Sequence, residues 1–547
     1  MNRVRPFAAI TVTIAASVLA SAPRAHDLAT STAGAALETL PEADFDLAAA
    51  RHLLMRAGFG AQASEVEALH GLGLAGLVDY LVDYEAQPEP PSSFAWKRAA
   101  QLPRPLDIAR LDEKQRRELR QRVVRDERTQ LVELRSTWMR RMIETKRPLE
   151  ERMTLFWHGH FTTSFRDVRD TKLLWLQHEL LRENATGNFG ELLHEVSRDP
   201  AMLAYLNNNQ NRKGKPNENY AREVMELFSL GIGNYEEKDI KEVARAFTGW
   251  TFDRRTARFV DSRRNHDTGI KTIFGQEGRY DGADVCDLLL AHEACAPYIA
   301  GKIFAYLAYE NPEPELVAEL GALLRSHRYE LKPLLRRIFT SRAFYSARAR
   351  GTQVKSPVVL LVSTTRMLGM GTSTAAGLVQ AAAALGQELF APPNVRGWEG
   401  GLSWITTSSL LERDNVCGAL VGATNARDLM GRPGAEARAQ ERPILDRLKR
   451  VARARRGAAA TQTRGFEACA FARRLGAKTV EDLVDGLAAT ILVVPLAAPT
   501  RAEILGFALG EDGSLPLRVD HLEGADMERK LREVLHLLMS TPEFQVC

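Results

Sequence analysis

Two histidines separated by one glycine, His158-Gly159-His160, are the residues of this chain best suited to hold a metal. Imidazole nitrogens bind zinc, iron, manganese and copper. Residues two apart point to nearly opposite sides of a helix but share one face of an extended segment. Because glycine disfavours helix, we expect the helix to end near Trp157 and both rings to face one metal. The alternative is a helix end whose histidines are hydrogen-bonded to the backbone.

A second group with suitable chemistry lies at the start of an expected helix. Asn217 is a good helix cap. Asn219, Glu223 and Glu226 then fall at i, i+4 and i+7, on one helix face. We expect Glu223 to be the third metal ligand and Glu226 to be a catalytic acid or base. The alternative is that Glu223 forms an ion pair with a neighbouring arginine.

A third group, His266-Asp267, lies in a stretch without helical periodicity. Functional side chains are often displayed on such segments. We expect both residues to be catalytic, with His266 as general acid or base or as a further metal ligand. The alternative is a turn held by Asp267.

Three further side chains are candidates for contacts with a substrate: Arg222, Asn219 and Arg396. With three protein ligands, a metal would keep an open position that activates water or oxygen. The first hypothesis is therefore a metal-dependent enzyme, either a hydrolase or an oxidoreductase. The second is a non-catalytic helical scaffold. A third, a polymer-binding module, would need a row of exposed aromatics, and Trp250, Trp398 and Trp404 are not regularly spaced.

The elements that position these residues are expected to be mainly α-helical. Apolar residues recur at helical spacing through residues 107–156, and further helices are expected at 172–182, 189–197, 221–230, 281–308, 314–341 and 357–369. Residues 251–275 break the pattern and predict a small β-hairpin or loop insert. The fold class is therefore a large multi-helix domain with a small β insert.

Four regions follow from composition. Residues 1–25 have a basic start and a short apolar stretch, which predicts a signal peptide and export to the periplasm, cell surface or medium. Residues 45–420 form the main helical domain, residues 426–461 an Arg/Ala-rich linker or exposed helix, and residues 462–547 a C-terminal helical segment packed on the main domain. No later stretch predicts a transmembrane helix.

The net charge and the cysteine content bear on the kinds of partner and metal site to expect. A formal net charge of +4 over 547 residues is close to balance and gives no electrostatic footprint for nucleic acid. The five cysteines form no CxxC pair, so a thiolate zinc site is not indicated. Cys286 and Cys295 are near enough in sequence to form a disulfide in an oxidising compartment.

The same motifs, with several others in one order, resemble the bacterial family called domain of unknown function 1800. The matching segments are HLL at 52–54, RAGFG at 56–60, MTLFWHGHF at 153–161, DPAM at 199–202, NENYARE at 217–223, ARAFTGW at 244–250, His266-Asp267, Lys271-Thr272, KSP at 355–357 and PPNVRGW at 392–398. The resemblance covers most of residues 50–545. Many members carry Asn where this chain has Gly159.

What this resemblance implies is a location rather than a reaction. Members are typically exported bacterial proteins, often encoded beside a second exported protein that looks sulfatase-like. The resemblance therefore implies a periplasmic or surface role and a sulfatase-like partner for the scaffold hypothesis. It supplies no catalytic residues.

Overall fold

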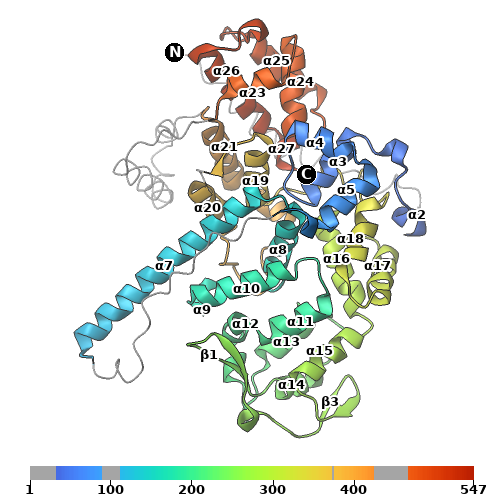
Figure 1. Cartoon of the computed structure of the whole chain (residues 1–547), viewed down its shortest axis with the longest axis vertical. Helices are drawn as coiled ribbons and strands as arrows, with labels where there is room; N and C mark the ends of the chain where they lie inside the picture. Colours follow the sequence, from blue (N-terminus) through green and yellow to red (C-terminus); the bar gives the residue numbers. More distant parts are fainter. Residues whose placement is uncertain (1–32, 89–110, 373–374, 424–465) are drawn as a thin grey trace.

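The computed structural model describes residues 33–88, 111–372, 375–423 and 466–547. The predicted signal peptide and the whole of the predicted Arg/Ala-rich linker lie outside these residues. As expected, the fold is mainly α-helical with a small β insert (Figure 1).

Helices before the β insert form the N-terminal part of the fold. They are α2 (Ala33–Leu37), α3 (Leu47–Arg56), α4 (Ala63–His70), α5 (Gly73–Val82), α7 (Glu113–Glu144), α8 (Pro148–His160), α9 (Phe165–Val168), α10 (Thr171–Glu183), α11 (Phe189–Arg198), α12 (Pro200–Tyr205), α13 (Glu218–Glu226) and α14 (Glu237–Ala246). Several begin where the sequence supplies a cap: the Asp112 side chain accepts from the Gln115 amide at the start of α7, and Pro148 opens α8.

The small β insert is present as predicted, and it consists of two antiparallel hairpins where one hairpin or a loop was expected. In the first, β1 (Trp250–Asp253) pairs with β2 (Arg258–Asp261), and in the second, β3 (Lys271–Ile273) pairs with β4 (Gln276–Gly278). The segment between β2 and β3 carries His266 and Asp267. The hairpin of β3 and β4 lies beside α14, and the hairpin of β1 and β2 lies beside α12 (Figure 1).

Helices after the insert complete the fold. They are α15 (Gly282–Ala291), α16 (Cys295–Leu307), α17 (Pro314–Ser326), α18 (Leu331–Thr340), α19 (Pro357–Met367), α20 (Ala375–Ala384), α21 (Thr407–Val421), α23 (Ala468–Arg474), α24 (Val480–Ile491), α25 (Ala498–Leu509), α26 (Gly524–Met539) and α27 (Pro542–Gln545). The apolar side chains gather in two clusters. One runs from Leu37 to Phe390, and the other joins α19 and α21 to the C-terminal helices.

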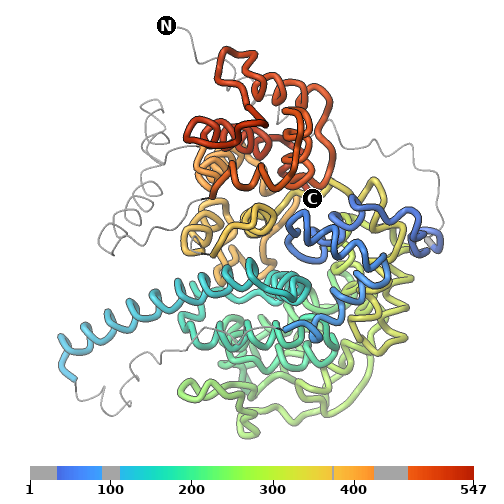
Figure 2. Tube along the Cα trace, turned by 45° about the horizontal axis from the view of Figure 1, so that its top comes forward, coloured from blue at the N-terminus to red at the C-terminus, as the bar shows by residue number. Residues whose placement is uncertain are grey.

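Helix α7 is packed along only part of its length. Its C-terminal half buries Leu131, Leu134 and Trp138, whereas residues 113–129 are mostly exposed. Both views show the N-terminal half, residues 113–129, standing away from the body (Figures 1 and 2). In the described part of the chain, no helix is both long enough and apolar enough to cross a membrane.

Helix α8 contradicts one expectation. It does not end near Trp157 but continues through Gly159 to His160, and the Phe161 amide still donates to the Trp157 carbonyl at 2.7 Å. Nearly every side chain of α8 is buried. Such packing outweighs the cost of a helical glycine, which is only about 1 kcal/mol. The Cys286–Cys295 disulfide is also not formed, since all five cysteines are buried free thiols.

Candidate functional site

The continuous helix sends the two predicted metal ligands to different partners. The His158 ring is buried, and its Nε2 accepts a hydrogen bond from the Phe390 amide at 3.0 Å. An acceptor nitrogen carries no proton, so the proton of the neutral ring lies on Nδ1. Burial, with Arg135 nearby, lowers the pKa of His158 to about 3 and keeps the ring neutral.

His160 has the opposite tautomer. Its Nε2 donates to the Phe228 carbonyl at 3.1 Å, just beyond the C-terminus of α13. The Nδ1 lone pair is buried and finds no hydrogen-bond partner in the described part of the chain. Burial, followed by the charge of Lys302, lowers the pKa of His160 well below its usual range. His160 therefore holds the end of the helix that carries Glu223 and Glu226.

The other side of the α8 terminus holds the loop formed by residues 390–398. His158 binds the start of this loop through the Phe390 amide, and Thr162 donates to the Val395 carbonyl at 2.5 Å. Gly397 has φ +80°, and a Cβ there would lie 2.5 Å from the Gly159 carbonyl oxygen. Glycine is therefore required at 397 both by conformation and by close approach. This loop carries Arg396.

The position of this loop brings the side chain of Arg396 to that of Glu226. Arg396 Nη2 lies 3.2 Å from Glu226 Oε1, and the Tyr235 hydroxyl donates to Glu226 Oε2 at 2.8 Å. The side chain of Glu226 is 17% exposed and that of Arg396 is 68% exposed. The ion pair is thus at the surface, with the carboxylate on its inner side.

Glu223 lies one turn before Glu226, and its carboxyl has different surroundings. Its half-buried carboxyl makes no hydrogen bond or salt bridge with any residue that the structure describes. Burial, and next the charge of Glu226, raise the pKa of Glu223. Two carboxylates on one helix face therefore have different surroundings, an arrangement by which enzymes separate acid and base roles.

The other residues predicted on α13 have partners of their own. Arg222 forms a two-pronged ion pair with Glu237, at 3.0 and 3.2 Å, and lies 3.5 Å from Glu218. The Asn217 side chain caps the helix by accepting from the Asn219 amide at 3.0 Å, as predicted. Asn219 itself is exposed. Arg222 and Asn219 lie on the same helix as Glu223, and the Arg222 guanidinium is already paired with Glu237.

His266 and Asp267 form a separate, well-supported turn. Nδ1 of His266 donates to the Thr248 carbonyl at 3.0 Å, which leaves Nε2 as an oriented acceptor. Arg245 donates to Asp267 at 2.9 Å, and this bond is the main reason that the pKa of Asp267 falls to about 2. Lys271 donates to the Asp267 carbonyl at 2.6 Å. No interaction joins this turn to the described residues around Glu223.

The predicted ligands His158, His160 and Glu223 do not come together as a set. Among the described residues, no group of three or more histidine, cysteine, aspartate or glutamate side chains is arranged to hold a metal. His158 also fits poorly as a ligand, because its lone pair is used by the Phe390 amide. What does come together is Glu223, Glu226 and Arg396, with the two histidines as supports.

Two tyrosines of the site were missed from the sequence. Tyr235 binds Glu226, and Tyr298 on α16 donates to the Leu227 carbonyl at 2.9 Å, next to the bond from His160. Tyr235 follows the glycines at 231 and 233, so its proximity to α13 could have been anticipated. Nothing in the spacing of Tyr298 indicated its role.

Comparison with known families confirms the resemblance. A family model described as Protein of unknown function (DUF1800) matches residues 52–546. The chain belongs to this family. The DUF1800 match includes every site residue described above and nearly all of both apolar clusters. No curated protein and no solved structure matches the chain.

Proposed function

We propose that this DUF1800 protein is an exported enzyme in which Glu223 transfers a proton to or from the substrate. The observation that carries the proposal is the contrast within one carboxylate pair. Glu226 is bound by Arg396 and Tyr235, whereas the Glu223 carboxyl has no hydrogen-bond or ion-pair partner among the described residues and its pKa is raised. Groups of this kind at a surface-open position are candidates for general acid–base catalysis.

Hydrolysis is the reaction class that this pair serves best. One carboxyl group can protonate a leaving group while a neighbouring carboxylate activates water or stabilises positive charge. The exposed guanidinium of Arg396 lies at the same opening and supplies a contact for an anionic or hydroxyl-bearing substrate.

The experiment is an activity screen of the exported protein against chromogenic esters, phosphoesters and glycosides, from pH 4 to pH 8. The parent is compared with Glu223→Gln and with Glu218→Gln on the same helix. We expect turnover in the parent and in Glu218→Gln, and a loss of at least about a hundredfold in Glu223→Gln. Absence of turnover in the parent, or equal turnover in Glu223→Gln, would contradict the proposal.

The tautomers of His158 and His160 limit which ring nitrogens could bind the predicted metal ion. Because the His158 lone pair accepts from the Phe390 amide, His160 Nδ1 is the nitrogen of this motif that is left for a zinc, iron, manganese or copper ion. Elemental mass spectrometry of the parent and of His160→Asn tests this. A stoichiometric metal that is lost in the variant supports metal dependence, and a parent that stays metal-free after reconstitution contradicts it.

A second candidate function is a scaffold for the sulfatase-like partner that the family resemblance implies. The observation in its favour is the protruding half of α7, where residues 113–129 carry seven basic and four acidic side chains. A basic helix of this kind offers a surface for an acidic partner. Co-elution with the neighbouring gene product, lost when Arg117 and Arg120 are replaced by Glu, would favour the scaffold.

A further inference from the structure

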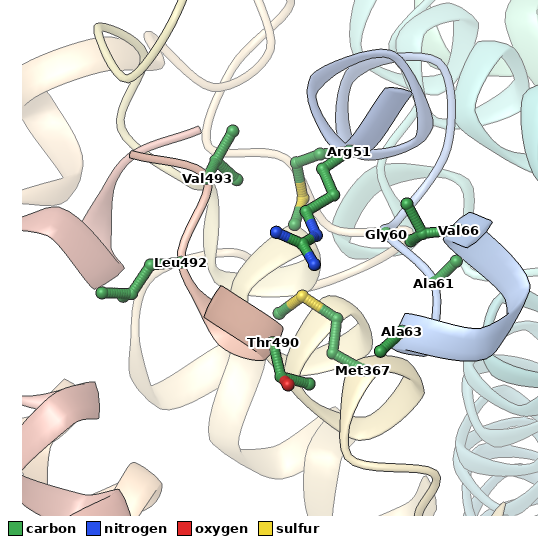
Figure 3. Close-up of a pocket in the computed structure, with 10 residues that line it drawn as sticks. Arg51, Gly60, Ala61, Ala63, Val66, Met367, Thr490, Leu492 and Val493 are labelled. Atoms are coloured by element: carbon green, nitrogen blue, oxygen red, sulfur yellow. The ribbon is translucent and has the colours of Figure 1, made fainter. Parts of the chain in front are cut away.

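The hollow beside Arg51, where α3 and α4 meet the end of α19 and the segment that follows α24, is too small for a ligand (Figure 3). Its volume is about 20 Å³, which is room for about one water molecule. The hollow therefore holds nothing larger than water.

A strongly basic surface lies at the start of α13. The loop of residues 211–216, which leads into this helix, exposes the side chains of Arg212, Lys213 and Lys215. The loop is fixed to the β insert, because the Lys213 amide donates to the Asn265 carbonyl at 2.8 Å. The three cations of the loop therefore lie next to the cations of the insert.

The insert adds five exposed arginines. Arg254 and Arg255 lie in the turn between β1 and β2, Arg258 begins β2, and Arg263 and Arg264 follow this strand. Each strand has four residues, a length of about 14 Å, and Figure 1 shows β1 at the edge of the fold. The cations extend from the hairpin turn to the loop before α13. These eight side chains form the basic surface.

The positive charge of the basic surface is not balanced by its neighbours. Residues 211–216 and 250–265 carry eight basic side chains and two acidic ones, Asp253 and Asp261, a net of six positive charges in a chain whose total is +4. The Asp253 carboxylate already accepts from backbone amides of the hairpin turn. None of the eight basic side chains forms a hydrogen bond or salt bridge with a residue that the structure describes. Such a surface fits a ligand with several negative charges.

The types of the exposed side chains indicate the chemistry of this ligand. Six of the eight cations are arginines, whose planar guanidinium binds two oxygens of one anionic group. Exposed amide side chains lie among them, with Gln210 just before the loop and Asn265 just after Arg264. Amides both donate and accept hydrogen bonds, as a ligand rich in hydroxyl groups requires.

The apolar residues of the hairpin argue against two other polyanions. Trp250 and Phe252 are buried and Phe259 is only partly exposed, so the bases of a single-stranded nucleic acid would find little to stack on. Val260, 40% exposed, is the one large apolar side chain that the hairpin displays among the described residues. A lipid surface is bound through a broader apolar face.

We infer that the basic surface binds a linear anionic polysaccharide, with the anionic groups of the polymer on the arginines and its hydroxyl groups on Gln210 and Asn265. Several cations spread over the hairpin and the loop engage successive anionic groups of one chain. The surface binds such a polymer whether or not Glu223 transfers a proton.

The test is the fluorescence anisotropy of labelled heparin titrated with the full chain at about 0.15 M salt. We expect saturable binding that weakens as the salt concentration rises, because salt screens exposed charges. Neutral dextran should not compete. A DNA duplex, and vesicles of phosphatidylcholine and phosphatidylglycerol in equal parts, should bind more weakly than heparin.

A variant of the hairpin tests the position of the site. Arg258→Gln, Arg263→Gln and Arg264→Gln together should weaken heparin binding roughly tenfold or more, since three charge contacts are lost. The fold should be retained in circular dichroism, because these side chains have no partner among the described residues.

A matched control removes the same number of cations elsewhere. Arg117→Gln, Arg122→Gln and Arg125→Gln together remove three exposed guanidinium groups from α7. This variant should bind heparin like the parent, because its substitutions lie outside the basic surface.

A further variant tests the contacts to sugar hydroxyl groups. Gln210→Ala with Asn265→Ala should weaken the binding of heparin but not that of linear polyphosphate, whose repeating units carry no sugar hydroxyl groups. The inference is overturned if the parent shows no saturable binding of heparin, if the α7 control loses as much affinity as the hairpin variant, or if the amide variant binds heparin like the parent. Tighter binding of the DNA duplex or of the vesicles than of heparin would also overturn it.

Discussion

Arg396 and Glu226 lie 170 residues apart in the chain, and their side chains meet at 3.2 Å. The C-terminus of α8 makes this possible. His160 binds the carbonyl that follows α13, and His158 binds the first residue of the loop that carries Arg396. The His-Gly-His motif thus joins two distant segments, and its residues act on the candidate site through the backbone.

The contact between Gly397 and Gly159 gives the first prediction. Gly397→Ala should lower the free energy of unfolding by about 2–4 kcal/mol, through a strained positive φ and a Cβ 2.5 Å from a carbonyl oxygen. Gly159→Ala is the matched control. A Cβ there meets no atom within 4 Å, so helix propensity should make this variant up to about 1 kcal/mol more stable. Urea unfolding measures both, and equal effects would contradict the packing described.

His158 predicts a dependence of stability on pH. Its pKa is about 3 in the folded protein and 6.5 in the unfolded chain, so the unfolded state binds the extra proton first. The neutral His158 ring therefore favours the folded state fully above pH 6.5, and this contribution to the free energy of unfolding is lost as the pH falls toward 3. In His158→Asn the slope of unfolding free energy against pH between pH 5.5 and pH 4 should be smaller by about 1.4 kcal/mol per pH unit. An unchanged slope would show that His158 is protonated in the fold.

Asp267 predicts a change in another pH range. Its pKa is lowered to about 2, so its ion pair with Arg245 stabilises the fold above the unfolded pKa of 3.8 and is lost as the pH falls through 2. Because the pair is partly exposed, Asp267→Asn should cost about 1–2 kcal/mol at pH 7. The difference from the parent should shrink below pH 3.8 and disappear only below pH 2. Thermal unfolding across this range tests it, and a loss that is independent of pH would contradict the ion-pair account.

Glu223 and Glu226 predict opposite effects of the same substitution. The pKa of Glu223 is raised, so its charge is unfavourable in the fold, and Glu223→Gln should stabilise the protein slightly at pH 7. Glu226→Gln weakens the bond to Arg396 and should be neutral or destabilising by less than about 1 kcal/mol, as for other surface pairs. Melting temperatures at pH 7 compare the two. A destabilised Glu223→Gln would show that Glu223 has a favourable partner.

The sequence predicted the elements better than it predicted the site. The Asn217 cap, the α-helical class and the hairpins followed from local signals. The end of α8 did not, because tertiary packing around Trp157 outweighed the propensity of Gly159. The roles of His158 and His160 could not be predicted either. The Phe390 amide and the Phe228 carbonyl set their tautomers, and both groups are distant in sequence. Tyr298 was missed for the same reason.

The most direct test of the account is a carbon-13 titration of the Glu223 carboxyl in protein labelled at glutamate Cδ, with the signal assigned by its absence from Glu223→Gln. The account predicts a midpoint above those of the exposed glutamates, and a lower midpoint for Glu223 in Glu226→Gln, because one of the two causes of the raised pKa is then removed. A Glu223 midpoint at or below those of the exposed glutamates would contradict its role as the proton-transfer group.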